Sequence, residues 1–365
     1  NNDRGVCFYC RQCARSCMAY ADFSSGSCLI FPAQKSGGQI DMFVNAMVRT
    51  VTTNSEGKAT GVSYIDKTDK TEYKLKGKVV VLAASACSSA RILLNSKSKQ
   101  HPNGLGNSSD AVGKYLHDST GGGRMAFIPD LIDRKIYNED GVGGMHVYSP
   151  WWLDNKKLDF PRGYHIEVWG GMGAPSYGTG FNVNAFNKFF GIPVGGYGDV
   201  LRKDMRKYYG SIIGMDGRGE SVAMKTNYCE IDPKQIDEFG VPTLRFNYKW
   251  SEHEVKQAEH MQNTFEEVIH NMGAIALGNK ADKSSNFGLT KPGEIIHEVG
   301  TTRMGNDPKI SVVNEFEQLH DVSNVFVVDA GPFVSQADKN PTWTIMALAW
   351  RSSDYIIEQF KKQNF

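Results

Sequence analysis

Four cysteines near the start of the chain have the spacing of a metal site. They form a C-x2-C-x2-C-x3-C array made of Cys7, Cys10, Cys13 and Cys17. Ferredoxin-type runs use this spacing to hold a [4Fe–4S] cubane or its three-iron relative, although Met18 stands where such a run carries proline. Four thiolates also satisfy tetrahedral zinc, and disulfides are the alternative without a metal. The spacing favours an iron–sulfur cluster over both.

A histidine and an asparagine near the C-terminal end have the types needed to oxidise an alcohol. His297 lies in the run IIHEVGTTRMG, and Asn340 lies in DKNPTW. Oxidation requires a base that takes the hydroxyl proton, and a neutral imidazole near its ordinary pKa suits that task. The carboxamide of Asn340 can hydrogen-bond the same hydroxyl without competing for the proton. Alone, His297 would more simply be a structural histidine, so the hypothesis depends on its surroundings.

The elements around this pair predict a strand, a loop and a helix. The apolar run before Asp329 indicates a buried parallel strand. Asn340 is a good N-cap and Pro341 suits the first helical position, so a helix should begin there and direct its positive end at a ligand beyond the strand. The helix should also pack one apolar face inward. That face consists of Trp343, Met346, Trp350, Ile357 and Phe360.

Three blocks resemble, in order and spacing, the closing signature of the glucose/methanol/choline (GMC) family of flavin oxidoreductases. They begin at His297, Val327 and Asn340. The resemblance implies that His297 is the catalytic base and Asn340 its partner, with FAD as cofactor. Ala330 replaces the glycine that is usual in the second block. The resemblance implies a set of cofactor-binding residues, namely Val48, Ala83, Ala84, Asp329, Ala330, Asn340, Pro341 and Thr342.

The fold expected from these patterns is α/β (α+β), with two domains and a cysteine-rich segment. Residues 1–30 carry the cysteines, 31–120 and 297–365 form an FAD-binding Rossmann-like domain, and 121–296 form a substrate-binding domain on a mostly antiparallel sheet. Apolar runs at 41–53, 59–66, 73–77 and 78–85 predict strands of the first domain. No strand followed by GxGxxG is found, so we expect that an N-terminal segment of the FAD-binding domain is missing.

Several residues before and inside the middle region match further family blocks. Val112, Gly113, Leu116 and Asp118 match one of them, but Ser119 stands where the family has histidine. We therefore assign no catalytic role to the neighbouring His117.

Two residues in the middle region are candidates for substrate contact. Glu220 would border the substrate, and Trp169 could stack on a sugar face, with a surface carboxylate and a core aromatic as the alternatives. Further along, Ser251 and Glu254 form a capping box that should start a long amphipathic helix, which Gly273 should end.

Composition narrows the range of partners. Lys and Arg number 41 and Asp and Glu 40, so nothing indicates a nucleic acid. No apolar run reaches the roughly 18 residues of a membrane-spanning helix. Within the family, the cysteine cluster and the region before residue 118 look most similar to bacterial glucoside 3-dehydrogenases.

That resemblance implies oxidation of a glucoside at C3, with electrons leaving through the cluster. The electron acceptor would be a cytochrome or a quinone, and a small accessory subunit and a periplasmic location are expected with it. Two alternatives stay open from the sequence. One is an alcohol or sterol oxidase or dehydrogenase without a redox cluster, and the other is a non-catalytic electron-transfer subunit.

Overall fold

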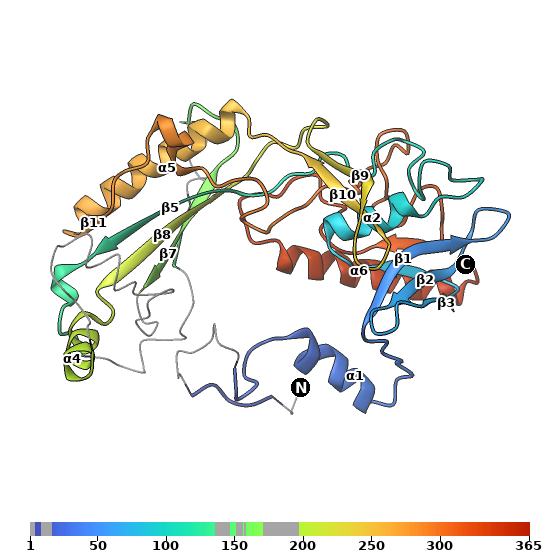
Figure 1. Ribbon diagram of the computed structural model, residues 1–365, viewed down its shortest axis with the longest axis horizontal. Helices are drawn as coiled ribbons and strands as arrows, with labels where there is room; N and C mark the ends of the chain where they lie inside the picture. The colour runs from blue at the N-terminus through green and yellow to red at the C-terminus, as the bar shows by residue number, and fades with distance from the viewer. Residues whose placement is uncertain (1–3, 9–16, 136–146, 151–155, 157, 171–196) are drawn as a thin grey trace.

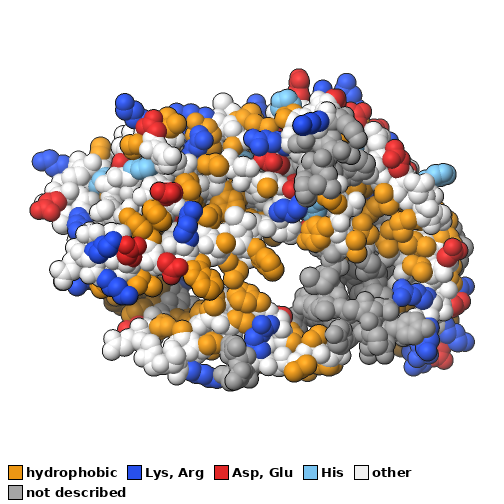
Figure 2. Space-filling model, turned by 180° about the vertical axis from the view of Figure 1, so that it is seen from behind, with side chains coloured by type: hydrophobic (Ala, Val, Ile, Leu, Met, Phe, Trp, Pro, Cys, Tyr) orange, Lys and Arg blue, Asp and Glu red, His pale blue; other side chains and the backbone are white. Residues whose placement is uncertain are grey.

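The computed structural model describes residues 4–8, 17–135, 147–150, 156, 158–170 and 197–365. The chain forms two lobes, one around α2 and α6 and the other around a sheet covered by α5, while the N-terminal segment with α1 lies below α6 in this view (Figure 1). Cys10 and Cys13 lie outside the described residues. From behind, the molecule is open at its centre, and hydrophobic side chains lie along the described part of the rim (Figure 2).

Two small sheets form the first lobe. An antiparallel sheet contains β1 (Ala46–Thr53), β2 (Ala59–Asp66) and β3 (Glu72–Lys76) in that order. A parallel pair contains β4 (Val80–Leu82) and β12 (Val325–Val327), in the register Val80 to Val325. The strands that the apolar runs predict are therefore present. The pairing also brings the two ends of the sequence together.

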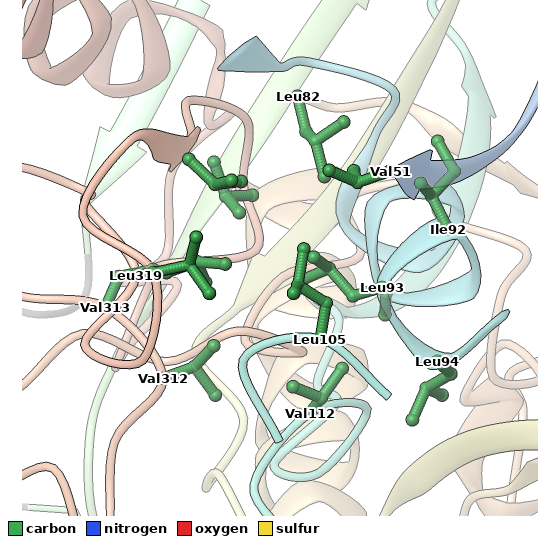
Figure 3. Packing of buried hydrophobic residues seen from close by; sticks show 14 of the residues in the cluster. Val51, Leu82, Ile92, Leu93, Leu94, Leu105, Val112, Val312, Val313 and Leu319 are labelled. Atoms are coloured by element: carbon green, nitrogen blue, oxygen red, sulfur yellow. The ribbon is translucent and has the colours of Figure 1, made fainter. Parts of the chain in front are cut away.

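Helix α2 (Ala86–Asn95) closes the core of this lobe. Its Ile92, Leu93 and Leu94 pack among residues from β1, β4 and the loop before β12, and Leu93 is fully buried (Figure 3). The hairpin of β9 (Tyr228–Ile236) and β10 (Pro242–Asn247) packs here too, although the predicted range placed it in the substrate-binding domain. Its Cys229 belongs to the same core cluster.

A five-stranded antiparallel sheet forms the second lobe, in the order β11-β5-β8-β7-β6. This confirms the prediction of a second domain on a mostly antiparallel sheet. Helix α5 (Glu252–Asn271) covers one face of it and buries Met261 and Phe265 completely. The strands are β5 (Thr120–Phe127), β6 (Val147–Pro150), β7 (Tyr164–Gly170), β8 (Ile212–Gly219) and β11 (Ile275–Leu277).

The ends of α5 are as the sequence predicts. The Ser251 hydroxyl and the Glu254 carboxylate form a capping box, and Gly273 follows the helix with a φ of 61°. Five further short helices lie in the described part of the chain, namely η2 (Gly26–Ile30), α1 (Phe31–Lys35), η3 (Pro129–Leu131), α4 (Asp199–Tyr208) and η5 (Lys283–Gly288).

Helix α6 (Thr342–Lys361) differs from its prediction in two ways. It begins one residue later, with Pro341 at the N-cap and no side chain capping it. The apolar face predicted to pack inward is on the surface, where the exposed fraction of Trp343 is 87% and that of Trp350 is 74%. The prediction was wrong because a second row at helical spacing, which includes Ile345 and Leu348, contacts the core instead.

No helix in the described ranges is both long and apolar enough to cross a membrane.

Candidate functional site

A short antiparallel bridge brings two distant sequence blocks together. The backbone N–H of His117 donates to the Val299 carbonyl at 3.0 Å, and the Val299 N–H donates to the His117 carbonyl at 2.9 Å. Gly300, with a φ of 98°, allows this close approach, since a Cβ there would lie 2.2 Å from the Tyr115 carbonyl oxygen. The bridge places the residue after His117 beside His297.

His297 is held through its backbone and its ring. Its N–H donates to Asp118 Oδ1 at 3.0 Å, and its Nδ1 lies 3.3 Å from the Ser119 hydroxyl. The sequence assigned no role to either residue: Asp118 only matched a family block, and Ser119 departed from it. Ser119, at the position where the family has histidine, is one of the residues that touch the predicted base. The block match was the signal that could have identified this pair.

The surroundings of His297 favour its neutral form. Burial and the nearby Arg218 guanidinium lower the pKa of His297 below its ordinary value, and the Glu167 carboxylate opposes them. The side chain is half-buried, so its other ring nitrogen is not sealed from a ligand. A neutral imidazole in this position can accept a proton near neutral pH.

His117 and Asp118, the two ionisable residues of the bridge segment, differ in how burial shifts their pKa values. His117 is fully buried, its Nδ1 lies 2.7 Å from the Tyr115 carbonyl, and burial lowers its pKa to about 4. It is a structural residue of the bridge. Burial and the charge of Glu298 raise the pKa of Asp118 to about 6.

The carboxyl ends of β4 and β12 bring the predicted cofactor-binding residues together. Ala83 and Ala84 are exposed beyond β4, and Asp329 and Ala330 follow β12. The Ala84 N–H donates to the Ser89 hydroxyl at 3.2 Å, and that hydroxyl donates to Asp329. Parallel strands usually present a ligand site at this edge of the sheet.

The other cofactor-binding predictions fall at different places. Pro341 and Thr342 form the start of α6, and Asn340 before them is exposed. Among the described residues, Asn340 forms no hydrogen bond to His297, so their joint action on one hydroxyl stays a prediction. Val48 lies on β1, half-buried against the core of the first lobe.

The two substrate candidates lie at the five-stranded sheet, Trp169 on β7 and Glu220 directly after β8. The Trp169 indole covers Gly214, where a Cβ would lie 2.1 Å from the ring, and donates to Asp216 Oδ2 at 2.8 Å. Glu220 follows β8, where its Oε1 lies 3.1 Å from Arg162 and accepts a hydrogen bond from the Ser335 hydroxyl. Both are therefore engaged with other side chains, and neither is a plain surface residue.

A cleft of about 420 Å³ opens beside the start of α2 and the end of β10. Asp118 and Glu298, both next to the His297 segment, line it together with Cys87 and Tyr248. Ser85 also faces the cleft and has a φ of 84° and a ψ of 157°, which is a region essentially reserved for glycine. Backbone strain of this kind gathers at functional sites.

Two of the predicted metal ligands can be placed. Cys7 is exposed, and Cys17 is half-buried and accepts a hydrogen bond from the Ala21 N–H at 3.3 Å. That hydrogen bond lowers the pKa of Cys17, which favours the thiolate form that binds metals. Among the described residues, no group of three His, Cys, Asp or Glu side chains could hold a metal ion. Cys10 and Cys13 are not among those residues.

Comparison with known proteins gives a consistent picture. Two models described as GMC oxidoreductase match residues 1–120 and 225–349. A solved structure of formate oxidase from Aspergillus oryzae RIB40 matches with a TM-score of 0.58 at 12% identity, covering 87% of this chain and 60% of that one. At this identity the similarity shows the fold alone.

Three sequence relatives are oxidoreductases. The 2-methyl-1,2-propanediol dehydrogenase of Mycolicibacterium austroafricanum is 30% identical over 88% of this chain and 55% of its own length. The gluconate 2-dehydrogenase flavoprotein of Pantoea cypripedii is 26% identical over 98% and 57%. The C-glycoside 3-oxidase of Arthrobacter globiformis is 25% identical over 88% and 54%. The chain thus spans little more than half the length of each relative.

Proposed function

The chain belongs to the GMC oxidoreductase family, and on that premise we propose that it acts in an FAD-dependent dehydrogenase that oxidises a secondary hydroxyl of a sugar. One observation carries the proposal. Asp118 and Ser119 hold His297 in a half-buried position that lowers its pKa, as a base for a hydroxyl proton requires.

The residues present fit FAD. The edge where β4 and β12 end carries the small side chains of Ala83 and Ala84, which allow close approach of a cofactor. The Thr302 hydroxyl is buried and has no hydrogen-bond partner among the residues that the structure describes, and it lies 2.3 Å from where a Cβ on Gly331 would stand. FAD bound in this place supplies the two-electron acceptor that alcohol oxidation needs.

The ring contacts of His297 define its task. If Nδ1 carries the hydrogen, it donates to the Ser119 hydroxyl, and Nε2 keeps the lone pair that accepts the substrate proton. Asp118 fixes the backbone of the base. Asn340 is proposed to orient the same hydroxyl by its carboxamide, and the uncapped first turn of α6 adds positive potential beside it.

The proposed substrate is a glucoside oxidised at C3, giving a 3-keto sugar. Support comes from the likeness to glucoside 3-dehydrogenases and from the 25% identity to a C-glycoside 3-oxidase. Trp169 on β7 and Glu220, which follows β8, are proposed to contact the sugar. An indole face and a carboxylate suit a sugar ring, which offers C–H groups on its faces and hydroxyls at its edge.

The proposal includes a route for the electrons. Cys7, Cys10, Cys13 and Cys17 would hold an iron–sulfur cluster, [4Fe–4S] or [3Fe–4S], whose chemistry is one-electron transfer. The acceptor would be a cytochrome or a quinone, reached with a small accessory subunit in the periplasm. The ferredoxin-type spacing supports this assignment over zinc. The lowered pKa of Cys17 favours the thiolate that either metal would bind. Iron and acid-labile sulfide in the purified protein test it, and zinc without sulfide would overturn it.

Anaerobic mixing with a glucoside tests the main proposal. The flavin absorbance of the FAD-loaded protein should bleach, and His297→Ala should slow bleaching by roughly 100-fold or more while the flavin stays bound. His253→Ala, which changes an exposed histidine on α5, is the matched control. Bleaching of His297→Ala at the parental rate would exclude His297 as the base.

One relative favours a second candidate substrate. The 30% identity to a 2-methyl-1,2-propanediol dehydrogenase supports a small branched alcohol in place of a sugar. The same bleaching experiment separates the two, because a diol that reduces the flavin faster than any glucoside selects the second candidate.

A further inference from the structure

A buried histidine links the five-stranded sheet to the loop that precedes α6. His165 on β7 is fully buried, and its two ring nitrogens face two different carboxylates. Nε2 lies 3.4 Å from Glu167 Oε1, and Nδ1 lies 3.4 Å from Asp338 Oδ2. Glu167 belongs to the same strand, whereas Asp338 lies 173 positions further along the chain. The His165–Asp338 contact therefore joins the two lobes.

The loop that carries Asp338 is attached to the sheet at a second point. Ser335 donates to Glu220, which follows β8. Within the loop, the Gln336 side chain braces the backbone, since its Nε2 donates to the Lys339 carbonyl at 2.9 Å. The chain then runs through Asn340 directly into α6. The position of Asn340 thus depends on a loop that is fastened to the other lobe.

The groups that face His165 are mostly charged. Besides Glu167 and Asp338 they are Arg218, which lies opposite on β8 and 3.7 Å from Glu167, and Tyr148 on β6, whose ring centroid is 5.0 Å away. Lys339 Nζ lies 3.5 Å from Nδ1 and pairs with Asp338. Because Lys339 belongs to the loop, its pair with Asp338 does not fasten the loop to the sheet. The positive charge of His165 in turn contributes to the lowered pKa of His297.

An imidazole between two carboxylates can satisfy both only when both nitrogens carry hydrogen. Burial and the charge of Lys339 act to lower the pKa of His165, but the hydrogen bonds that its ring donates to Asp338 and Glu167 outweigh them, and the pKa is raised. Asp338 shows the reciprocal effect, since its pKa is lowered in spite of burial. The geometry and the two directions agree on a charged imidazolium.

We propose that His165, as an imidazolium shared by Glu167 and Asp338, is a positioning residue. It fastens loop 335–340 to the five-stranded sheet and so fixes the position of Asn340 relative to His297. Loss of its proton removes the positive charge that both carboxylates share and leaves one N–H for the two of them, so the attachment of the loop weakens. We call this contact between His165 and Asp338 the tether. Only its role in catalysis rests on the proposed function. Its structural part can be measured without any substrate.

Amide hydrogen exchange of residues 335–340 measures the tether directly. In the unaltered chain these amides should be protected at low pH and lose roughly 10- to 100-fold of that protection as His165 deprotonates, after correction for the chemical exchange rate. His165→Gln and Asp338→Asn should show the lower protection at every pH. Asp338→Asn lies outside the sheet, so it tests the contact even if His165→Gln folds poorly.

Glu266→Gln is the control variant. It removes an ion pair of 2.8 Å between Arg124 on β5 and Glu266 on α5, in the same lobe but not at the loop. It should keep both the protection and its pH dependence. Histidine NMR gives a second readout, because the resonance lost in His165→Gln should titrate at lower pH in Asp338→Asn than in the unaltered chain.

The outcomes separate this inference from the proposed function. The tether is overturned if the loop amides exchange at the same rate in His165→Gln as in the unaltered chain. It is also overturned if their protection is the same below and above the pH at which His165 titrates. Either result holds even if sugar reduces the flavin. A loop that responds as expected in a protein whose flavin no sugar reduces would leave the tether standing and remove the proposed function. With both intact, His165→Gln should lower kcat more than it raises KM and abolish the alkaline loss of activity.

Discussion

The backbone N–H of His297 donates to Asp118 Oδ1 at 3.0 Å, and the same oxygen accepts the Ser119 N–H at 2.7 Å. One buried carboxylate oxygen therefore holds the backbone of the proposed base and of the residue whose hydroxyl contacts its ring. These residues are almost 180 positions apart in the chain. The geometry of the site thus depends on Asp118, which touches no reacting atom in the proposed reaction.

Asp118→Asn should change how stability depends on pH. Burial raises the pKa of Asp118 from 3.8 to about 6, so its stabilising contribution is complete below pH 4 and is lost as pH rises through 6. We expect the variant, relative to the unaltered chain, to be more stable at pH 7.5 than at pH 4.5 by at most about 3 kcal/mol. Urea unfolding at both pH values measures this.

Asp41→Asn, at an exposed position, is the control for that comparison and should show no such difference. An equal effect of Asp118→Asn at the two pH values would mean that the carboxyl is not protonated preferentially in the folded state.

Arg218→Gln should move the acid side of the activity profile. Burial lowers the pKa of His297 and Arg218 lowers it further, while Glu167 opposes. Without the guanidinium the base should gain its proton at higher pH, so the acid limb of kcat/KM shifts to higher pH. Arg245→Gln breaks a 2.8 Å pair with Glu230 on the β9–β10 hairpin and should leave the limb in place. A downward shift in Arg218→Gln would contradict this electrostatic account.

Ser85→Gly should stabilise the protein. Ser85 has a φ of 84° and a ψ of 157°, a conformation that costs a residue with a Cβ about 1–3 kcal/mol. Glycine removes that strain but loses about 0.5–1 kcal/mol of backbone entropy, so a net gain of about 1 kcal/mol is expected. Ser88→Gly, inside α2, should instead destabilise by about 0.5–1 kcal/mol. Thermal unfolding of both variants checks the opposite signs, and a loss of stability in Ser85→Gly would show that the serine is not strained.

The sequence correctly predicted structural features that depend on residues close together in the chain. Ser251 and Glu254 specify the start of α5 by satisfying its first free N–H groups, and the structure has that capping box. The strand before Asp329 was equally readable from its apolar run. On α6 the same reasoning failed. Two rows of apolar residues share the helix, and periodicity alone does not say whether Trp343 or Ile345 faces the core.

The contacts of the polar side chains on β7 could not be predicted from the sequence. His165 and Glu167 alternate with Tyr164 and Ile166, which indicates a strand with two different faces but not what either face meets. The partner of His165 is Asp338, in a loop of the other lobe. Only the assembled fold could show that contact, because nothing near His165 in the chain points to it.

Ser352→Ala should destabilise the protein more at high pH than at low pH. Glu317 is fully buried, burial raises its pKa to about 7, and the Ser352 hydroxyl donates to its Oε2 at 2.7 Å and opposes that rise. Without this donor the ionised carboxylate loses its partner, at a cost of about 1–3 kcal/mol. At pH 5, where Glu317 is protonated in the folded state, the cost should fall.

The neighbouring serine provides the control for this last prediction. Ser353 donates to the Ala349 carbonyl at 2.7 Å on the exposed side of the same helix, so Ser353→Ala should have a small effect that does not depend on pH. In a Glu317→Gln background the cost of Ser352→Ala should also become independent of pH, because no ionisable group remains at that position. Urea unfolding of the four variants at pH 5 and pH 8 tests the argument, and a pH-dependent cost that survives Glu317→Gln would assign the effect to another group.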